Sequence, residues 1–149
     1  PILPRATPCD ELESIMDTYG TLEGTLQGFM IFFPRSGEAA TVTRQILTLV
    51  DTGTENVHAL YDLIPACTLP GKDGWMPPAR KRQTNPAICA ALTKVSSDVS
   101  QTVELTNHLA KAQGLPDNLY IEALQEAAED AGAKIKVVEG VLRTSDGCA

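Results

Sequence analysis

The sequence predicts an all-α protein, an up-down-up-down bundle of four helices in a single domain that covers residues 1–149. Four long stretches carry apolar residues at the steps of three and four that mark amphipathic helices. Segments with proline or glycine separate these stretches, and two of the three separations are short. Four widely spaced cysteines, without a Cys-x-x-Cys pair, predict two disulfides rather than a zinc site.

The first predicted helix covers residues 10–33. Asp10 precedes Glu13 by three positions, which is typical of a capping box, and Pro34 follows the last apolar residue. Residues 29–33 are apolar on every side of this helix, whereas a surface helix keeps one polar face. We therefore expect this segment to be covered by the rest of the domain, by a partner or by a bound apolar molecule.

Three further helices follow along the chain. The second covers residues 38–64 and ends before Pro65, because a residue that precedes proline avoids the helical conformation. The third is predicted over residues 86–113, where a proline stands at the first helical position. The fourth covers residues 117–142. No internal sequence repeat is evident in the chain.

Residues 65–85 are rich in proline and glycine and show no helical period, so we expect one long loop, a feature that is often functional in a compact domain. Trp75 is either an anchor packed on the domain, a lid residue or a hot spot for a partner. Arg80, Lys81 and Arg82 follow it. This triplet is a solvated basic turn, a dibasic processing site or a contact for an anionic head group.

The bundle topology brings all four cysteines to the same end of the molecule. Three pairings are then open, and we expect Cys67 to pair with Cys89 across the base of the loop, and Cys9 with Cys148 at the termini. Disulfides persist in oxidising compartments, and the chain starts at Pro1 rather than at a methionine. Together these features predict a secreted, extracellular protein.

Several function classes fit the sequence poorly. A net charge of −7 argues against nucleic acid as a partner, and no apolar run is long enough for a transmembrane segment. His58 and His108 are expected far apart along the bundle, so no metal site is predicted. Because nucleophile, phosphate-binding and dinucleotide-binding motifs are missing, the sequence favours a binding protein without a cofactor over an enzyme.

Stripes rich in small apolar residues run through residues 10–143, among them Val42, Ile46, Leu49 and Val50 in the second predicted helix and Ala127, Ala128, Ala131 and Ile135 in the fourth. In this pattern the chain resembles the fungal hydrophobic surface-binding and cell-wall mannoprotein group. The resemblance implies a helical secreted protein that binds fatty acids or apolar surfaces.

We therefore expect a secreted binding protein for an apolar small molecule, such as a fatty acid or a sterol. The site is expected at the end of the bundle opposite the cysteines, with a lining of Phe29, Met30, Phe33, Val42, Ile46, Leu109 and Tyr120. The alternative is a secreted effector or interaction protein that docks on a host or partner protein through residues 65–85. Its contacts would then be Trp75, Arg80, Lys81 and Arg82.

Overall fold

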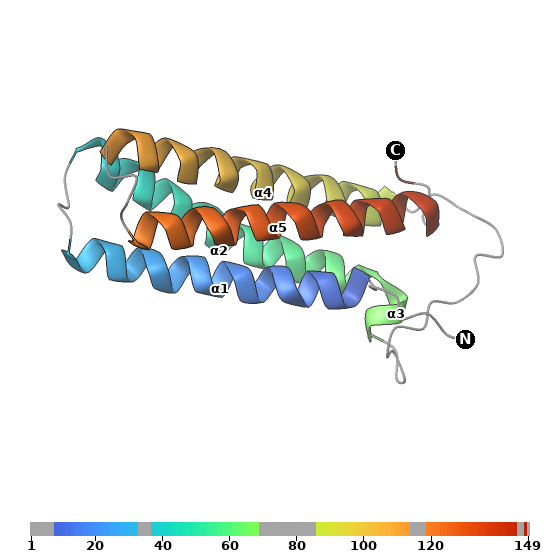
Figure 1. Ribbon diagram of the computed structural model, residues 1–149. Helices are drawn as coiled ribbons and strands as arrows, with labels where there is room; N and C mark the ends of the chain where they lie inside the picture. Colours follow the sequence, from blue (N-terminus) through green and yellow to red (C-terminus); the bar gives the residue numbers. More distant parts are fainter. Residues whose placement is uncertain (1–7, 33–36, 69–85, 114–118, 146–147, 149) are drawn as a thin grey trace.

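A computed structural model describes residues 8–32, 37–68, 86–113, 119–145 and Cys148. These residues form helices only, with no strand among them: α1 (Pro8–Phe32), α2 (Glu38–Leu63), α3 (Pro65–Thr68), α4 (Pro86–Gln113) and α5 (Leu119–Ser145). The four long helices lie side by side as an antiparallel up-down-up-down bundle, as Figure 1 shows. The predicted fold class is confirmed.

The helix boundaries agree with the predicted ranges to within three residues. One local prediction is wrong: α1 begins at Pro8, so Asp10 lies inside its first turn and does not act as the N-cap. Asp10 and Glu11 place negative charge in that turn, where it interacts favourably with the positive end of the helix dipole and stabilises the helix. The last helix continues through Ser145, three residues beyond the predicted end.

The chain turns sharply between α2 and α3. Ile64 is extended, with φ −87° and ψ 112°, because Pro65 follows it. The prediction of a loop over residues 65–85 is therefore wrong at its start, because Pro65–Thr68 are helical. The remainder, residues 69–85, lies outside the described residues. In Figure 1, α3 lies beside the start of α1, which brings Cys67 to the first helix rather than to α4.

The four cysteines do gather at one end, but the predicted pairing is wrong. Cys9 is bonded to Cys67, and Cys89 to Cys148. The physical reason is the position of α3, which carries Cys67 towards α1, while the end of α5 returns Cys148 to the start of α4. Each disulfide therefore ties the start of one long helix, α1 or α4, to the segment that follows the next long helix: Cys67 in α3 follows α2, and Cys148 follows α5.

The chain is thus built as two disulfide-closed hairpins. Hairpin 1 contains α1, α2 and α3, and hairpin 2 contains α4 and α5. Across the bundle, α1 packs most closely on α5 and α2 on α4, so the closest helix contacts lie between the hairpins. No disulfide crosses these two inter-hairpin interfaces, which noncovalent contacts hold.

Many of the inward-facing residues occur at the same sequence spacing in hairpin 1 and in hairpin 2. Along the first helix of each hairpin, Cys9, Leu12, Ile15, Tyr19, Leu22, Leu26 and Phe29 match Cys89, Leu92, Val95, Val99, Thr102, Thr106 and Leu109. Along the second long helix, Ala40, Thr43, Val50 and Val57 match Ile121, Leu124, Ala131 and Val138, and beyond these helices Cys67 matches Cys148. The disulfides also span nearly equal separations, 58 and 59 residues. The repeat lies in the spacing of buried positions, whereas the residue types differ.

At the end of the bundle opposite the cysteines, aromatic packing joins α1 to α5. The rings of Phe29 and Tyr120 meet edge to face at 6.4 Å. Gly28 makes this approach possible, because a Cβ there would lie 2.9 Å from the Tyr120 ring. Ile31 and Leu119 are 68% and 78% exposed at the same end, so the apolar segment that ends α1 is only partly buried among the described residues.

Candidate functional site

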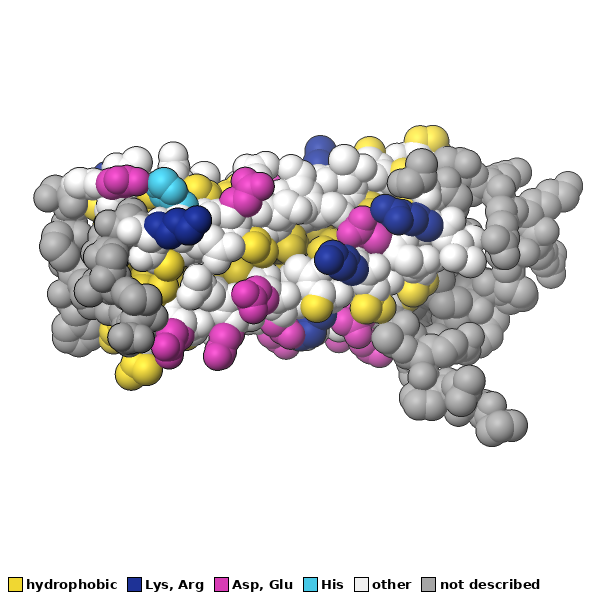
Figure 2. Space-filling view, turned by 45° about the horizontal axis from the view of Figure 1, so that its top comes forward, with side chains coloured by type: hydrophobic (Ala, Val, Ile, Leu, Met, Phe, Trp, Pro, Cys, Tyr) yellow, Lys and Arg dark blue, Asp and Glu magenta, His cyan; other side chains and the backbone are white. Residues whose placement is uncertain are grey.

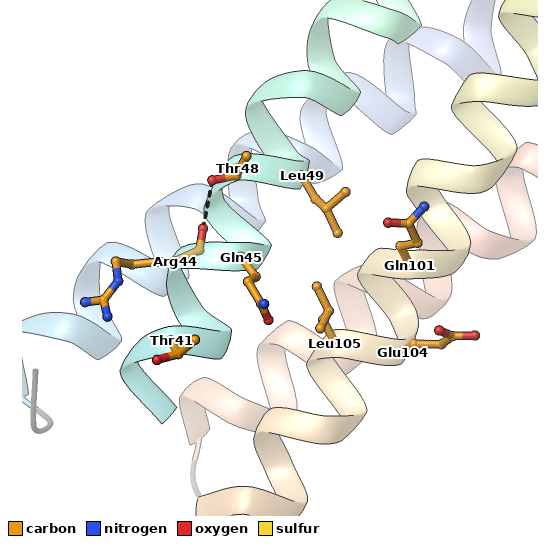
Figure 3. Close-up of a pocket in the computed structure, with 8 residues that line it drawn as sticks. All are labelled: Thr41, Arg44, Gln45, Thr48, Leu49, Gln101, Glu104 and Leu105. Carbon is orange, nitrogen blue, oxygen red and sulfur yellow. Dashed lines mark hydrogen bonds between the residues drawn. The ribbon is translucent and has the colours of Figure 1, made fainter. Parts of the chain in front are cut away.

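A groove of about 610 Å³ runs between α2 and α4, across one of the inter-hairpin interfaces (Figure 3). Leu49 and Leu105 extend into it from the two helices, and Gln45 and Gln101 lie beside them. The full lining is Thr41, Arg44, Gln45, Thr48, Leu49, Gln101, Glu104 and Leu105. We call this feature the α2/α4 groove.

The helical period explains how α2 supplies one wall of this groove. Val42, Ile46 and Val50 are buried in the core, which turns the adjoining positions of the helix towards the groove. The hydroxyls of Thr41 and Thr48 donate to carbonyl oxygens one turn earlier, at 3.2 and 3.0 Å. Because these hydroxyls are already bonded to their own helix, the wall offers fewer polar groups than its composition suggests.

Two charged side chains of opposite sign stand at the rim. Arg44 lies on α2 and Glu104 on α4, and within the described residues neither side chain makes an ion pair. Figure 3 shows the Arg44 guanidinium turned away from Leu105. The groove therefore combines an apolar centre with a charged edge, an arrangement common in sites for small molecules.

A buried polar cluster adjoins the groove on its cysteine side. The Asn56 amide donates to a carboxylate oxygen of Asp98 at 2.6 Å, which links α2 to α4. Tyr19 reaches this interface from α1, and Gly53 leaves room for its ring, since a Cβ at that position would lie 2.9 Å from the phenol. We call Tyr19, Asn56 and Asp98 the polar cluster.

The Tyr19 hydroxyl is the unusual member of the polar cluster. Its side chain is completely buried, and the hydroxyl has no hydrogen-bond partner among the described residues. Burial raises the pKa of this phenol well above its usual range, and the nearby charge of Asp98 raises it further. A buried hydroxyl without a partner is costly, so this atom is a natural contact for a bound polar group.

A second groove, of about 730 Å³, lies between α4 and α5 within hairpin 2. Figure 2 shows this face hollowed along its length, with hydrophobic side chains at the base and charged side chains along the rims. Glu104, Glu129, Lys136 and Glu139 border it, and the buried Ser96 hydroxyl there finds no partner in the part of the chain that the structure describes. With more charged residues at its edge, this groove suits an apolar molecule less well than the α2/α4 groove.

The described residues among those predicted to line a ligand site lie at the end opposite the cysteines. The structure places Phe29, Val42, Ile46 and Leu109 in the hydrophobic core, each at most 4% exposed, and Tyr120 packs against that core. Met30 is half-buried, and Phe33 lies outside the described residues.

Sequence reasoning missed the residues of the α2/α4 groove. Leu49 lies in the predicted apolar stripe of the second helix, Leu105 lies outside the predicted stripes, and both side chains are only partly buried. The sequence does contain a signal for them: Leu49 and Leu105 are apolar residues beside the inward-facing stripe of their helix, and they extend its apolar face towards the surface.

The predicted docking residues Trp75, Arg80, Lys81 and Arg82 lie outside the described residues, so docking through this segment stays a prediction. Among the residues the structure describes, no group of three potential metal ligands occurs. His108 is paired with Glu38 at 2.7 Å across the α2/α4 interface. None of the described helices has both the length and the apolar character that a membrane span requires.

The fold and the groove define a class: a four-helix protein made of two disulfide-closed hairpins, with a surface groove where the hairpins meet. No protein-family model, curated protein or solved structure matches the chain. The resemblance to the fungal surface-binding group therefore stays a prediction, and the site is argued from its own geometry.

Proposed function

We propose that this protein binds an apolar small molecule, such as a fatty acid or a sterol, in the α2/α4 groove. The groove itself carries the proposal: Leu49 and Leu105 form its centre, and the threonine hydroxyls on its wall are bonded to their own helix. Its volume of about 610 Å³ lies within the range of small-molecule sites. The proposal moves the site from the predicted end of the bundle to its side.

The expected affinity follows from burial of apolar surface. Each methylene group removed from water contributes roughly 0.8 kcal/mol, so a long chain is held well and a short one weakly. The groove is open to solvent along one side, so only part of a ligand is buried there. The protein should therefore prefer elongated ligands that lie along both leucines.

We also propose that the protein is secreted. All four cysteines are paired, and disulfides of this kind persist outside the cell or in other oxidising compartments. A hydrophobic ligand is poorly soluble in the aqueous medium outside the cell, so a secreted protein that binds it would act as its carrier.

The test is a titration of the purified protein with the uncharged fluorescent probe N-phenylnaphthylamine. The variants Leu49→Asn and Leu105→Asn should each weaken binding about tenfold, because each removes apolar contact from the centre of the groove. Val137→Asn is the matched control, since Val137 is a 41% exposed residue of α5 outside both grooves. Circular dichroism establishes that each variant is folded.

Two results would contradict the proposal. One is the absence of saturable binding to the unaltered protein. The other is binding that Val137→Asn weakens as much as Leu49→Asn and Leu105→Asn do, because the probe would then bind apolar surface without regard to the groove.

A further inference from the structure

The polar cluster lies next to the α2/α4 groove along both helices. On α2, Gly53 comes one turn after Leu49; on α4, Asp98 comes just under one turn before Gln101. The cluster therefore stands at the cysteine-side end of the groove, between the two hairpins. The three cluster residues do not line the groove themselves, so a ligand that lies along the leucines would meet them beyond its cysteine-side end.

The cluster has unused hydrogen-bonding capacity. The Tyr19 hydroxyl, buried without a partner, can both donate and accept. Asp98 is 9% exposed, and one of its carboxylate oxygens accepts from Asn56. A carboxylate has room for several donors, so Asp98 can accept a further hydrogen bond.

The chemistry of these groups discriminates between ligand head groups. A hydroxyl can donate to Asp98 and accept from Tyr19, which satisfies the partnerless phenol. A carboxylate can do only the second, and it would bring a second negative charge to a buried one. The net charge of −7 on the chain adds a weak long-range repulsion of an anionic ligand.

We propose that Tyr19 and Asp98 form the polar end of the ligand site and select an apolar molecule that ends in an uncharged hydroxyl, such as a long-chain alcohol or a sterol, over a carboxylate. This inference rests on the proposed function and narrows its ligand class. Access requires α2 to move slightly away from α4. The two helices belong to different hairpins, and no disulfide joins them.

The experiment uses two competitors of equal chain length, hexadecanol and hexadecanoate. Each displaces N-phenylnaphthylamine from the whole protein at neutral pH, in the unaltered chain and in the variants Asp98→Asn and Tyr19→Phe. Tyr61→Phe is the matched control, because the Tyr61 hydroxyl bonds Glu13 at the exposed surface of hairpin 1.

Hexadecanol should bind the unaltered protein at least tenfold more tightly than hexadecanoate. Asp98→Asn should reduce that preference about tenfold, mainly by strengthening hexadecanoate, because the amide carries no charge and still accepts from Asn56. Tyr19→Phe should weaken hexadecanol about fivefold and leave the probe unaffected, since it removes only the hydroxyl. Tyr61→Phe should change neither competitor.

Equal or tighter binding of hexadecanoate to the unaltered protein would overturn this inference, and so would a preference that Asp98→Asn leaves intact. In both cases probe binding in the groove would still support the proposed function. If the probe and both competitors fail to bind, the proposed function falls and this inference falls with it.

Discussion

The first helices of the two hairpins, α1 and α4, occupy matching places in the bundle but bury different chemistry. Where α1 has Leu22 and Leu26, the matching positions of α4 hold Thr102 and Thr106, and all four side chains are at most 1% exposed. At these two positions, the same backbone arrangement gives an apolar interior on α1 and a more polar one on α4. The polar cluster lies elsewhere along these helices and draws on both of them, because Tyr19 comes from α1 and Asp98 from α4.

The two inter-hairpin interfaces differ in the same sense. Between α1 and α5, the cross-helix hydrogen bond runs from Thr18 to Asp130, whose side chain is about half exposed. Between α2 and α4, the exposed pair of His108 and Glu38 is joined by a second bond, from Asn56 to the buried Asp98. A polar interaction at the surface is easily replaced by water, whereas a buried one needs a specific partner. Four predictions test this comparison, in order of decreasing effect.

The largest effect should come from the disulfides, and it should be the same in both hairpins. Replacing Cys9 and Cys67 by serine, or Cys89 and Cys148 by serine, should each lower the free energy of unfolding by about 4 kcal/mol, because the two closed loops are nearly equal in length. Urea unfolding followed by circular dichroism measures both values. A difference above about 2 kcal/mol would show that the hairpins are not equivalently closed.

The next effect compares matching core positions. Leu22→Ala should cost about 3 kcal/mol of unfolding free energy, the usual loss for a buried leucine. Thr102→Ala should cost about 1 kcal/mol, because it removes one methyl group and a hydroxyl bonded to the Asp98 carbonyl at 2.7 Å. Equal losses in the same urea experiment would contradict the contrast between α1 and α4.

A smaller effect concerns helical glycines with different surroundings. Gly53→Ala should lower stability by about 1–2 kcal/mol, because its Cβ would meet the buried Tyr19 ring and the gain in helix propensity does not offset that clash. Gly24→Ala should raise stability by up to about 1 kcal/mol, since nothing lies near its Cβ position. Thermal unfolding of both variants measures the two signs, and a stabilising Gly53→Ala would show that Tyr19 is free to move.

The smallest effect should be the pH dependence at the α1/α5 interface. Hydrogen bonding to Lys134, with a further contribution from that lysine's charge and from Thr18, holds the pKa of Asp130 below its usual value. A lowered pKa stabilises the folded state above about pH 4, and this stabilisation is lost as the pH falls further. Because the group is half exposed, the effect should be less than about 1 kcal/mol. Asp130→Asn should remove it, and an unchanged acid profile in that variant would contradict this assignment.

Much of the fold could be predicted because prolines and apolar stripes mark its boundaries. Pro65 ends α2, and Pro86 begins α4, for reasons that depend only on neighbouring residues. The inward spacing from Leu12 to Phe29 likewise locates the buried face of α1. The capping prediction at Asp10 failed because the helix begins at Pro8, which puts Asp10 inside its first turn.

The disulfide pairing and the groove could not be predicted in the same way. All four cysteines meet at one end, so the pairing depends on how α3 directs Cys67, which is a tertiary property. The repeated spacing was hidden because matching positions, such as Leu22 and Thr102, differ in residue type. The role of Leu49 and Leu105 depends on how closely α2 approaches α4, which a stripe on a single helix does not specify.

Mass spectrometry of a non-reduced tryptic digest, prepared with free thiols blocked, tests most directly whether each hairpin is closed on itself. The four cysteines fall on separate peptides, residues 6–35, 45–72, 83–94 and 144–149. We expect the first to be linked to the second and the third to the fourth. A bond between the second and third peptides would lock α2 to α4 and contradict an interface that can open for a ligand.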